Sequence, residues 1–193
     1  MKITFVEIQN YRKLLSCKID FDEKETIFVG ANNSGKTSAM DALIVFLKDK
    51  SKFTTQDFTL SHWKEINSIG TFWINATDEN PPNLAIEQWQ DLLPQLDVWI
   101  HVENSELHYI NHLIPALDWK GGQLGVRLRY EPKSVAELYK EFLSASKSST
   151  ATINAIKKDG KSTLKLWPKT MWDFLERKLH EHFEIKAYML DPK

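Results

Sequence analysis

The sequence predicts a mixed α/β fold built around a strand, a glycine-containing loop and a helix. Residues 3–9 and 17–21 alternate apolar and polar side chains, which is typical of strands with one buried face. Residues 26–30 form a short apolar run of the kind found in covered central strands. The loop after this run leads into a helix expected over residues 36–48, with a buried face of apolar side chains at three- and four-residue spacing: Met40, Leu43, Ile44 and Leu47. Val45 and Phe46 widen this face.

Later segments extend this core. Strands are expected at residues 69–76, 97–103 and 124–130, and the last is the clearest because its apolar and basic side chains alternate. Helices are expected at residues 84–96 and 105–117, where apolar side chains follow helical spacing. These segments together predict an antiparallel extension of the sheet, with helices between its strands.

The last third of the chain begins with a helix signal. Ser134 and Glu137 form a capping box, in which each side chain can satisfy a backbone N–H of the other residue. Residues 144–165 are rich in serine, threonine, alanine and lysine, so we expect a mobile loop or long hairpin there. A helix at about 170–183 and the start of a strand at 185–190 complete the predicted elements.

The composition indicates a globular protein of the reduced cytoplasm. With 25 basic and 26 acidic residues among 193, the net charge gives no electrostatic reason to expect nucleic acid binding. The single cysteine, Cys17, excludes a disulfide within the chain. No stretch approaches the ~18 apolar residues that a membrane span requires. We therefore expect a cytoplasmic localisation and no membrane partner.

One motif carries specific chemistry. Residues 30–37 satisfy every fixed position of the phosphate-binding loop, G-x4-G-K-[ST]. Gly30 and Gly35 let the backbone N–H groups approach an anion, while the N-terminus of the next helix adds the positive end of its dipole. Lys36 would stabilise charge on the transferred phosphate as the catalytic residue, and the Thr37 hydroxyl would bind Mg²⁺. The sequence thus predicts binding of ATP and Mg²⁺ through Gly30, Ala31, Asn32, Asn33, Ser34, Gly35, Lys36, Thr37 and Ser38.

Two resemblances to known families accompany this motif. Asn10-Tyr11-Arg12 followed by Gly30-Ala-Asn-Asn-Ser-Gly-Lys-Thr37 resembles the N-terminal half of the ABC-type ATPase head of the SMC, RecF and OLD group. The later segments Asp57-Phe58, Leu117-Asp118-Trp119 and Leu124–Pro132 are similar to the OLD family of ATP-dependent nucleases, which includes proteins of phage-defence and retron systems.

The resemblance implies further site residues and partners. Arg12 would lie near the nucleotide phosphates, and Gln56 would stand near the metal as the glutamine of ABC proteins does. Such heads act as homodimers or higher homo-oligomers, and the full-length protein would bind DNA, with a defence-system protein or nucleic acid as a possible further partner. The implied function is an ATPase that gates a DNA nuclease.

The same resemblance implies that the site continues outside this chain. Residues 1–50 would be the phosphate-loop core, 51–143 antiparallel strands and helices, 144–165 the loop or hairpin, and 166–193 a helix and the start of a strand. A complete LSGGQ-like element and an Asp-Glu strand are missing. We expect these parts of the ATPase, and a Toprim nuclease domain, beyond residue 193, and expect the segment alone to be inactive.

Two alternatives to the gated nuclease stay open. The first is a RecF- or SMC-like clamp for DNA repair or chromosome organisation that has the same ATPase head and no nuclease. The second is a nucleotide-sensing module that binds ATP without hydrolysing it. ATP hydrolysis by the full-length protein would separate the second from both others.

Overall fold

The computed structural model of this chain describes residues 1–32, 34–110, 119–156 and 167–190, with side chains up to residue 149 in the third range. The fold is mixed α/β, as predicted. The chain forms two compact units, each made of separate stretches. Unit 1 comprises Met1–Lys52, Leu93–Tyr130 and Ile185–Lys193, and unit 2 comprises Phe53–Leu92 and Glu131–Glu184.

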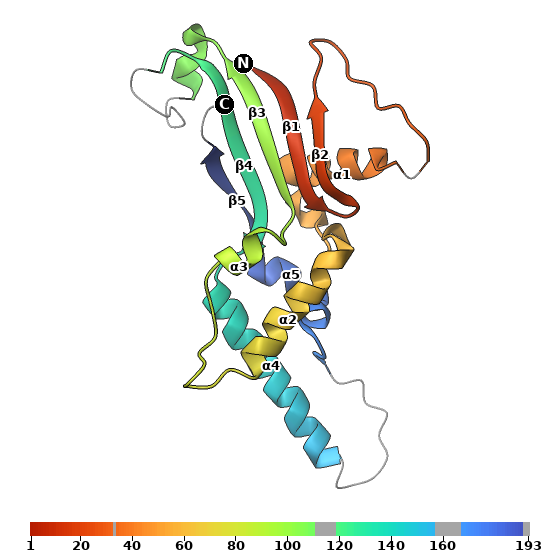
Figure 1. Ribbon diagram of the computed structural model, residues 1–193, viewed down its shortest axis with the longest axis vertical. Coiled ribbons are helices and arrows are strands. Elements are labelled where there is room, and N and C mark those ends of the chain that lie inside the picture. The colour runs from red at the N-terminus through yellow and green to blue at the C-terminus, as the bar shows by residue number, and fades with distance from the viewer. Residues whose placement is uncertain (33, 111–118, 157–166, 191–193) are drawn as a thin grey trace. The chain divides into compact units, whose positions relative to one another are not determined.

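A five-stranded sheet is the main feature of unit 1 (Figure 1). Its strands follow the order β2-β1-β3-β4-β5, and β1 pairs antiparallel with β2 and β3, as β3 does with β4. The predicted strands at 3–9, 17–21, 97–103, 124–130 and 185–190 are all confirmed. Their bounds are β1 (Lys2–Tyr11), β2 (Leu14–Asp20), β3 (Gln95–Val102), β4 (Gly122–Pro132) and β5 (Phe183–Leu190).

Helix α1 (Lys36–Leu47) contacts β1, β2 and β3. The predicted helix is confirmed, but its predicted buried face is wrong at three of the four residues that defined it. Met40, Ile44 and Leu47 are 50%, 41% and 50% exposed. The buried side instead carries Ala39, Ala42, Val45 and Phe46. The two alanines are small enough to let the helix approach its neighbours closely.

The predicted central strand at residues 26–30 is also wrong. The segment between β2 and α1 runs outside the sheet as irregular backbone (Figure 1). Its apolar side chains Ile27 and Val29 are 71% and 88% exposed. A strand needs a neighbour for its backbone N–H and C=O groups, and none of the described strands pairs with this run.

Unit 2 is mainly helical. It contains α2 (Trp63–Ile74), the short α3 (Glu87–Gln90), α4 (Val135–Ile156) and α5 (Met171–His182), together with 3-10 helices at Thr55–Asp57 and Leu60–His62. Helices α2 and α5 are joined by a hydrogen bond of 2.9 Å from the backbone N–H of Trp172 to Oδ1 of Asn67. The core between the helices is aromatic: Trp63, Trp73, Trp89, Phe142 and Phe174 are each at most 4% exposed.

Helix α2 occupies the segment where a strand was predicted at residues 69–76, so that prediction is wrong. The run is rich in β-branched and aromatic residues, which favour strands when considered alone. Burial nevertheless follows helical spacing, through Trp63, Ile66, Gly70 and Trp73. A Cβ on Gly70 would lie 3.1 Å from Cβ of Met171, so the glycine allows α2 and α5 to approach closely.

The helix predicted at 84–96 is mostly wrong, and the one predicted at 105–117 is tested only over its first residues. Only α3 is helical in the first range, because Pro94 disfavours helical backbone in the residue before it and β3 begins directly afterwards. In the second range the chain forms a 3-10 helix over Asn104–Tyr109. The rest of that range, 111–118, lies outside the described residues.

The expected loop or hairpin at 144–165 is wrong over its first part, because α4 continues to Ile156. Serine, threonine and lysine cost a helix less than about 0.7 kcal/mol each, and no glycine or proline interrupts residues 135–156. The Ser148 hydroxyl donates to the Ser144 carbonyl oxygen at 2.9 Å, so this polar side chain has a hydrogen-bond partner within the helix. Residues 157–166 lie outside the described part.

Within the described ranges, no helix has both the length and the apolar composition to cross a bilayer.

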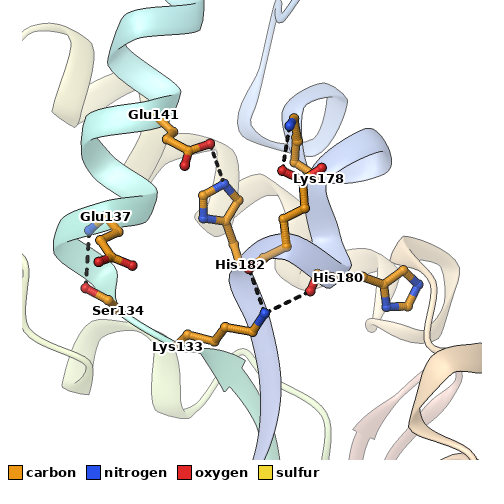
Figure 2. A network of polar contacts seen from close by, with 8 residues as sticks. Lys133, Ser134, Glu137, Glu141, Lys178, His180 and His182 are labelled. Carbon is orange, nitrogen blue, oxygen red and sulfur yellow. Dashed lines mark hydrogen bonds and ion pairs between the residues drawn. The ribbon is translucent and has the colours of Figure 1, made fainter.

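A polar network joins α4, α5 and the end of β4 (Figure 2). The predicted capping box is partly confirmed, since the backbone N–H of Glu137 donates to Oγ of Ser134 at 3.3 Å. The Lys133 ammonium donates to the carbonyls of His180 and Glu181 at 3.0 and 2.7 Å, which satisfies the last turn of α5. His182 pairs with Glu141 of α4 at 3.1 Å. These contacts join α4 and α5 within unit 2.

Candidate nucleotide-binding site

The predicted phosphate loop lies in unit 1, between the exposed segment 26–30 and α1 (Figure 1). Gly35 immediately precedes the helix and has a φ of 91°, a left-handed conformation that glycine adopts without strain. A Cβ on Gly35 would lie 2.9 Å from Cδ2 of Leu14, the first residue of β2. Gly35 is therefore required both for the turn into α1 and for close contact between the loop and the β1–β2 hairpin.

The Lys36 side chain curls back over the loop. Its ammonium donates to the carbonyl oxygens of Gly30 and Ala31 at 2.5 and 2.6 Å, and to Oγ of Ser34 at 3.2 Å. Hydrogen bonds from a charged donor are stronger than neutral ones, so these contacts hold a cation within the turn of the loop. The lysine thereby gives this part of unit 1 a local positive charge.

The N-terminus of α1 adds to that positive charge. Its first turn carries no acidic residue, and Gly35 offers no side chain to cap it. The first N–H groups of a helix have no acceptor within the helix and bear the positive end of its dipole. Thr37 is exposed and Ser38 is half-buried, so the Thr37 hydroxyl is accessible to a metal ion. The loop and helix end have the groups that a nucleoside triphosphate with Mg²⁺ requires.

Arg12 lies in the turn between β1 and β2. Its φ is 52°, a conformation uncommon for a residue with a side chain, and Asn10 has a φ of 56° in the same region. The Arg12 guanidinium donates through Nη1 to Oδ2 of Asp41 in α1 at 2.5 Å, and both side chains are 35% exposed. The turn is thus attached to the phosphate-loop helix at Arg12.

Other predicted site residues are not brought together by unit 1. Gln56 is exposed in the 3-10 helix Thr55–Asp57 of unit 2, so its role near the metal stays a prediction. Asn33 lies outside the described residues. Among the residues that are described, no three His, Cys, Asp or Glu side chains gather as a metal site would require. The part of the predicted site that the fold assembles is the loop, the start of α1 and Arg12.

Two residues in contact with the site were not predicted from the sequence. Leu14 touches Gly35, and Asp41 binds Arg12. Asp41 did carry a detectable signal, because it is the one acidic residue of α1 and lies four positions after Thr37 on the same helix face. Leu14 carried none, since its contact depends on how the hairpin packs.

A glycine turn, a lysine over the turn and an uncapped helix N-terminus together define a P-loop nucleotide-binding domain. Comparison with known families agrees with this class. Residues 1–192 match the AAA ATPase domain family, and the chain belongs to that family.

Individual relatives cover less of the chain. The DNA replication and repair protein RecF of an Exiguobacterium species is 34% identical over 64 residues, which are 33% of this chain and 17% of that protein. The RecF protein of Bacillus mycoides is 35% identical over 65 residues, 34% of this chain and again 17% of the relative. The matched segments thus span about a sixth of the length of these curated relatives.

A solved structure also resembles the chain. It is described under the ATP-driven dimerization and DNA-stimulated activation of SMC ATPases. The two chains have a TM-score of 0.35 and 17% sequence identity, and the match covers 68% of this chain and 64% of the other. The family match over nearly the whole chain, and not this weaker similarity, is what assigns the chain to the ATPases.

Proposed function

We propose that this chain is the N-terminal half of an ABC-type ATPase head of the SMC and RecF kind, and that it binds the phosphates of ATP. The observation that carries the proposal is the phosphate loop. The Lys36 ammonium is held over the turn of this loop, and the loop leads directly into the uncapped N-terminus of α1. Membership of the AAA ATPase domain family supports it.

Each residue of the proposed site has a separate role. The backbone of residues 30–35 wraps the phosphates, and Lys36 turns from the loop carbonyls to the β and γ phosphates. Thr37 supplies the hydroxyl ligand for Mg²⁺, which neutralises the phosphate oxygens when bound. Arg12 adds a guanidinium, which binds phosphate oxygens in a bidentate manner.

Exposed apolar surface beside the loop supports the view that this is half of a site. Ile27 and Val29 precede the loop and are 71% and 88% exposed, and Met40, Ile44 and Leu47 on one side of α1 are about half exposed. Apolar side chains that cluster at a surface mark a contact with another part of a protein. We infer that the rest of the ATPase head, with the carboxylate that activates water, covers this surface, and that a second head completes the site as a homodimer.

What the full-length protein does with ATP has two candidate answers. The first is a DNA nuclease of the OLD type, gated by ATP and acting in antiphage defence, which rests on the similarity of Leu124–Pro132 and neighbouring segments to that family. The second is a DNA repair or chromosome clamp without nuclease, which the similarity of about a third of the chain to RecF favours. Incubating the full-length protein with plasmid DNA, ATP and Mg²⁺ distinguishes them, because only the first would nick or linearise the DNA.

The direct test of nucleotide binding is the variant Lys36→Ala. Loss of charge-assisted hydrogen bonds to the phosphates should raise the Kd for ATP about 10- to 100-fold, measured by calorimetry with Mg²⁺. Lys48→Ala is the matched control, since Lys48 lies at the opposite end of the same helix. Equal ATP affinity in wild type and Lys36→Ala would refute the assignment of the loop.

A further inference from the structure

The turn between β1 and β2 has a conformation that its sequence does not favour. Tyr11 pairs with Leu14, so Arg12 and Lys13 form a two-residue hairpin turn. Arg12 has a φ of 52°, at a position where such turns usually carry glycine, and this conformation costs a residue with a side chain about 1–2 kcal/mol. Unfavourable backbone of this kind is concentrated at functional sites, where other contacts maintain it.

Two contacts hold this turn against the phosphate loop and its helix. On one side, Leu14 lies against Gly35, close enough that a Cβ there would be 2.9 Å from Cδ2 of Leu14. On the other side, Arg12 binds Asp41 at 2.5 Å. The turn is therefore fixed at two points of the same loop and helix.

The place of Asp41 on α1 determines where the guanidinium lies. Asp41 follows Thr37 by four residues, and residues with this spacing lie above one another on one helix face, about one turn or 5.4 Å apart. Arg12 is thus held on the face of α1 that carries the proposed Mg²⁺ ligand. A guanidinium has five N–H donors in one plane and can bind a carboxylate and a phosphate at the same time.

We propose that Asp41 is a positioning residue for nucleotide binding, which holds Arg12 in the strained turn and directs its guanidinium toward the phosphates of ATP. The proposal rests on the nucleotide-binding function proposed above and adds a residue to that site. Asp41 itself does not touch the nucleotide; it acts through Arg12.

The test compares ATP affinity among variants of the 193-residue chain, by calorimetry with Mg²⁺. Asp41→Asn preserves shape and removes the charge, and should weaken ATP binding about three- to tenfold. Arg12→Ala should weaken it at least as much, and adding Asp41→Asn to Arg12→Ala should have no further effect, because Asp41 acts only through Arg12. Asp20→Asn is the matched control, since Asp20 forms an ion pair of 2.8 Å with Lys18 in the same hairpin.

A charge exchange separates positioning from simple structural support. The double variant Arg12→Asp with Asp41→Arg keeps an ion pair between the turn and α1, so its thermal stability should approach that of the wild type. Its ATP affinity should stay low, because the cation no longer extends from the turn. Recovery of wild-type ATP affinity by the exchange would overturn the proposal.

A second measurement needs no nucleotide. In a ¹⁵N spectrum of the arginine side chains, the Arg12 guanidinium should give a distinct signal with slow exchange in the wild type and lose it in Asp41→Asn, and ATP with Mg²⁺ should shift it in the wild type. An Arg12 signal identical in both proteins would contradict the proposal, as would unchanged or tighter ATP binding by Asp41→Asn. Failure of the wild-type chain to bind ATP would instead refute the proposed function, and the positioning role with it.

Discussion

At the scale of single residues, Gly35 restricts the phosphate loop in two separable ways. Its φ of 91° disfavours any side chain, and the Leu14 side chain fills the space that a Cβ would need. We predict that Gly35→Ala lowers the free energy of unfolding by about 2–3 kcal/mol, of which about 1–2 kcal/mol is backbone conformation and the remainder the contact with Leu14. Chemical denaturation followed by tryptophan fluorescence measures the change.

The chain offers a control for each part of this effect. Gly122 has a φ of 130°, and open space surrounds the position that a Cβ on it would occupy, so Gly122→Ala should show the conformational part alone. Combining Leu14→Ala with Gly35→Ala removes the contact but keeps the free-energy cost of the unfavourable backbone conformation at residue 35. If Gly35→Ala and Gly122→Ala cost the same, the contact with Leu14 does not contribute to the stability of the loop.

Residues of the site differ in how far sequence predicts them. The loop residues were predictable because phosphate binding fixes glycines, a lysine and a hydroxyl at set spacing along one short segment. The place of Arg12 required a family resemblance, since no local pattern links residue 12 to residue 36. Asp41 and Leu14 required the fold, because their contacts join a hairpin to a helix.

At the scale of elements, period-two strands were predicted well and helices less well. The strands were predictable because apolar side chains recur at every second position in parts of the sequence, as at Leu124, Val126 and Leu128 of β4. Helix α2 was mistaken for a strand because Ile69, Phe72 and Ile74 favour strands by composition while the helical period decides what is buried. In α1 both sides are apolar, so periodicity does not indicate which one faces the sheet.

A cross-strand ion pair stabilises the middle of the sheet. Arg127 of β4 donates to both carboxylate oxygens of Asp97 in β3 at 2.7 and 2.6 Å, and Asp97 is 2% exposed. Removing one charge leaves the other partly buried without its partner, so Asp97→Asn should cost about 2–4 kcal/mol of unfolding free energy. Lys18–Asp20 provides an exposed control, and Asp20→Asn should cost less than about 1 kcal/mol.

The pH dependence of this effect follows from the arginine. The hydrogen bond with Asp97 raises the pKa of Arg127 above its ordinary value. A group whose pKa is raised by folding stabilises the protein fully below its unfolded pKa, and that contribution is lost only as pH rises through the higher folded value. The contribution of Arg127 should therefore be constant through the neutral range. Denaturation of wild type and Asp97→Asn at about pH 6 and about pH 9 should give the same difference; a difference that shrinks at the higher pH would contradict this explanation.

At the scale of the whole molecule, α1 has two apolar sides, of which one is buried and the other is exposed. One side, with Ala42 and Val45, is buried in unit 1. The other side, with Met40, Ile44 and Leu47, is 41–50% exposed, and the separate run 26–30 exposes Ile27 and Val29. A central strand was predicted for that run because its apolar residues are typical of a covered sheet. Such a strand cannot form from its own residues, since it depends on neighbouring strands for hydrogen bonds.

The proposal of an incomplete ATPase head gives this open side a testable consequence. Replacing Met40, Ile44 and Leu47 together by glutamine should change the unfolding free energy of this chain by less than about 1 kcal/mol, because these side chains are exposed and glutamine favours helix. Val45→Gln on the buried side should cost more than about 2 kcal/mol. The triple variant should also reduce self-association in light scattering, since it removes apolar surface.

In the longer protein that the proposal assumes, the same triple change should lower the Tm, because the polar side chains would then lie against the second half of the head. An unchanged Tm there would show that the open side of α1 is not covered by the rest of the ATPase.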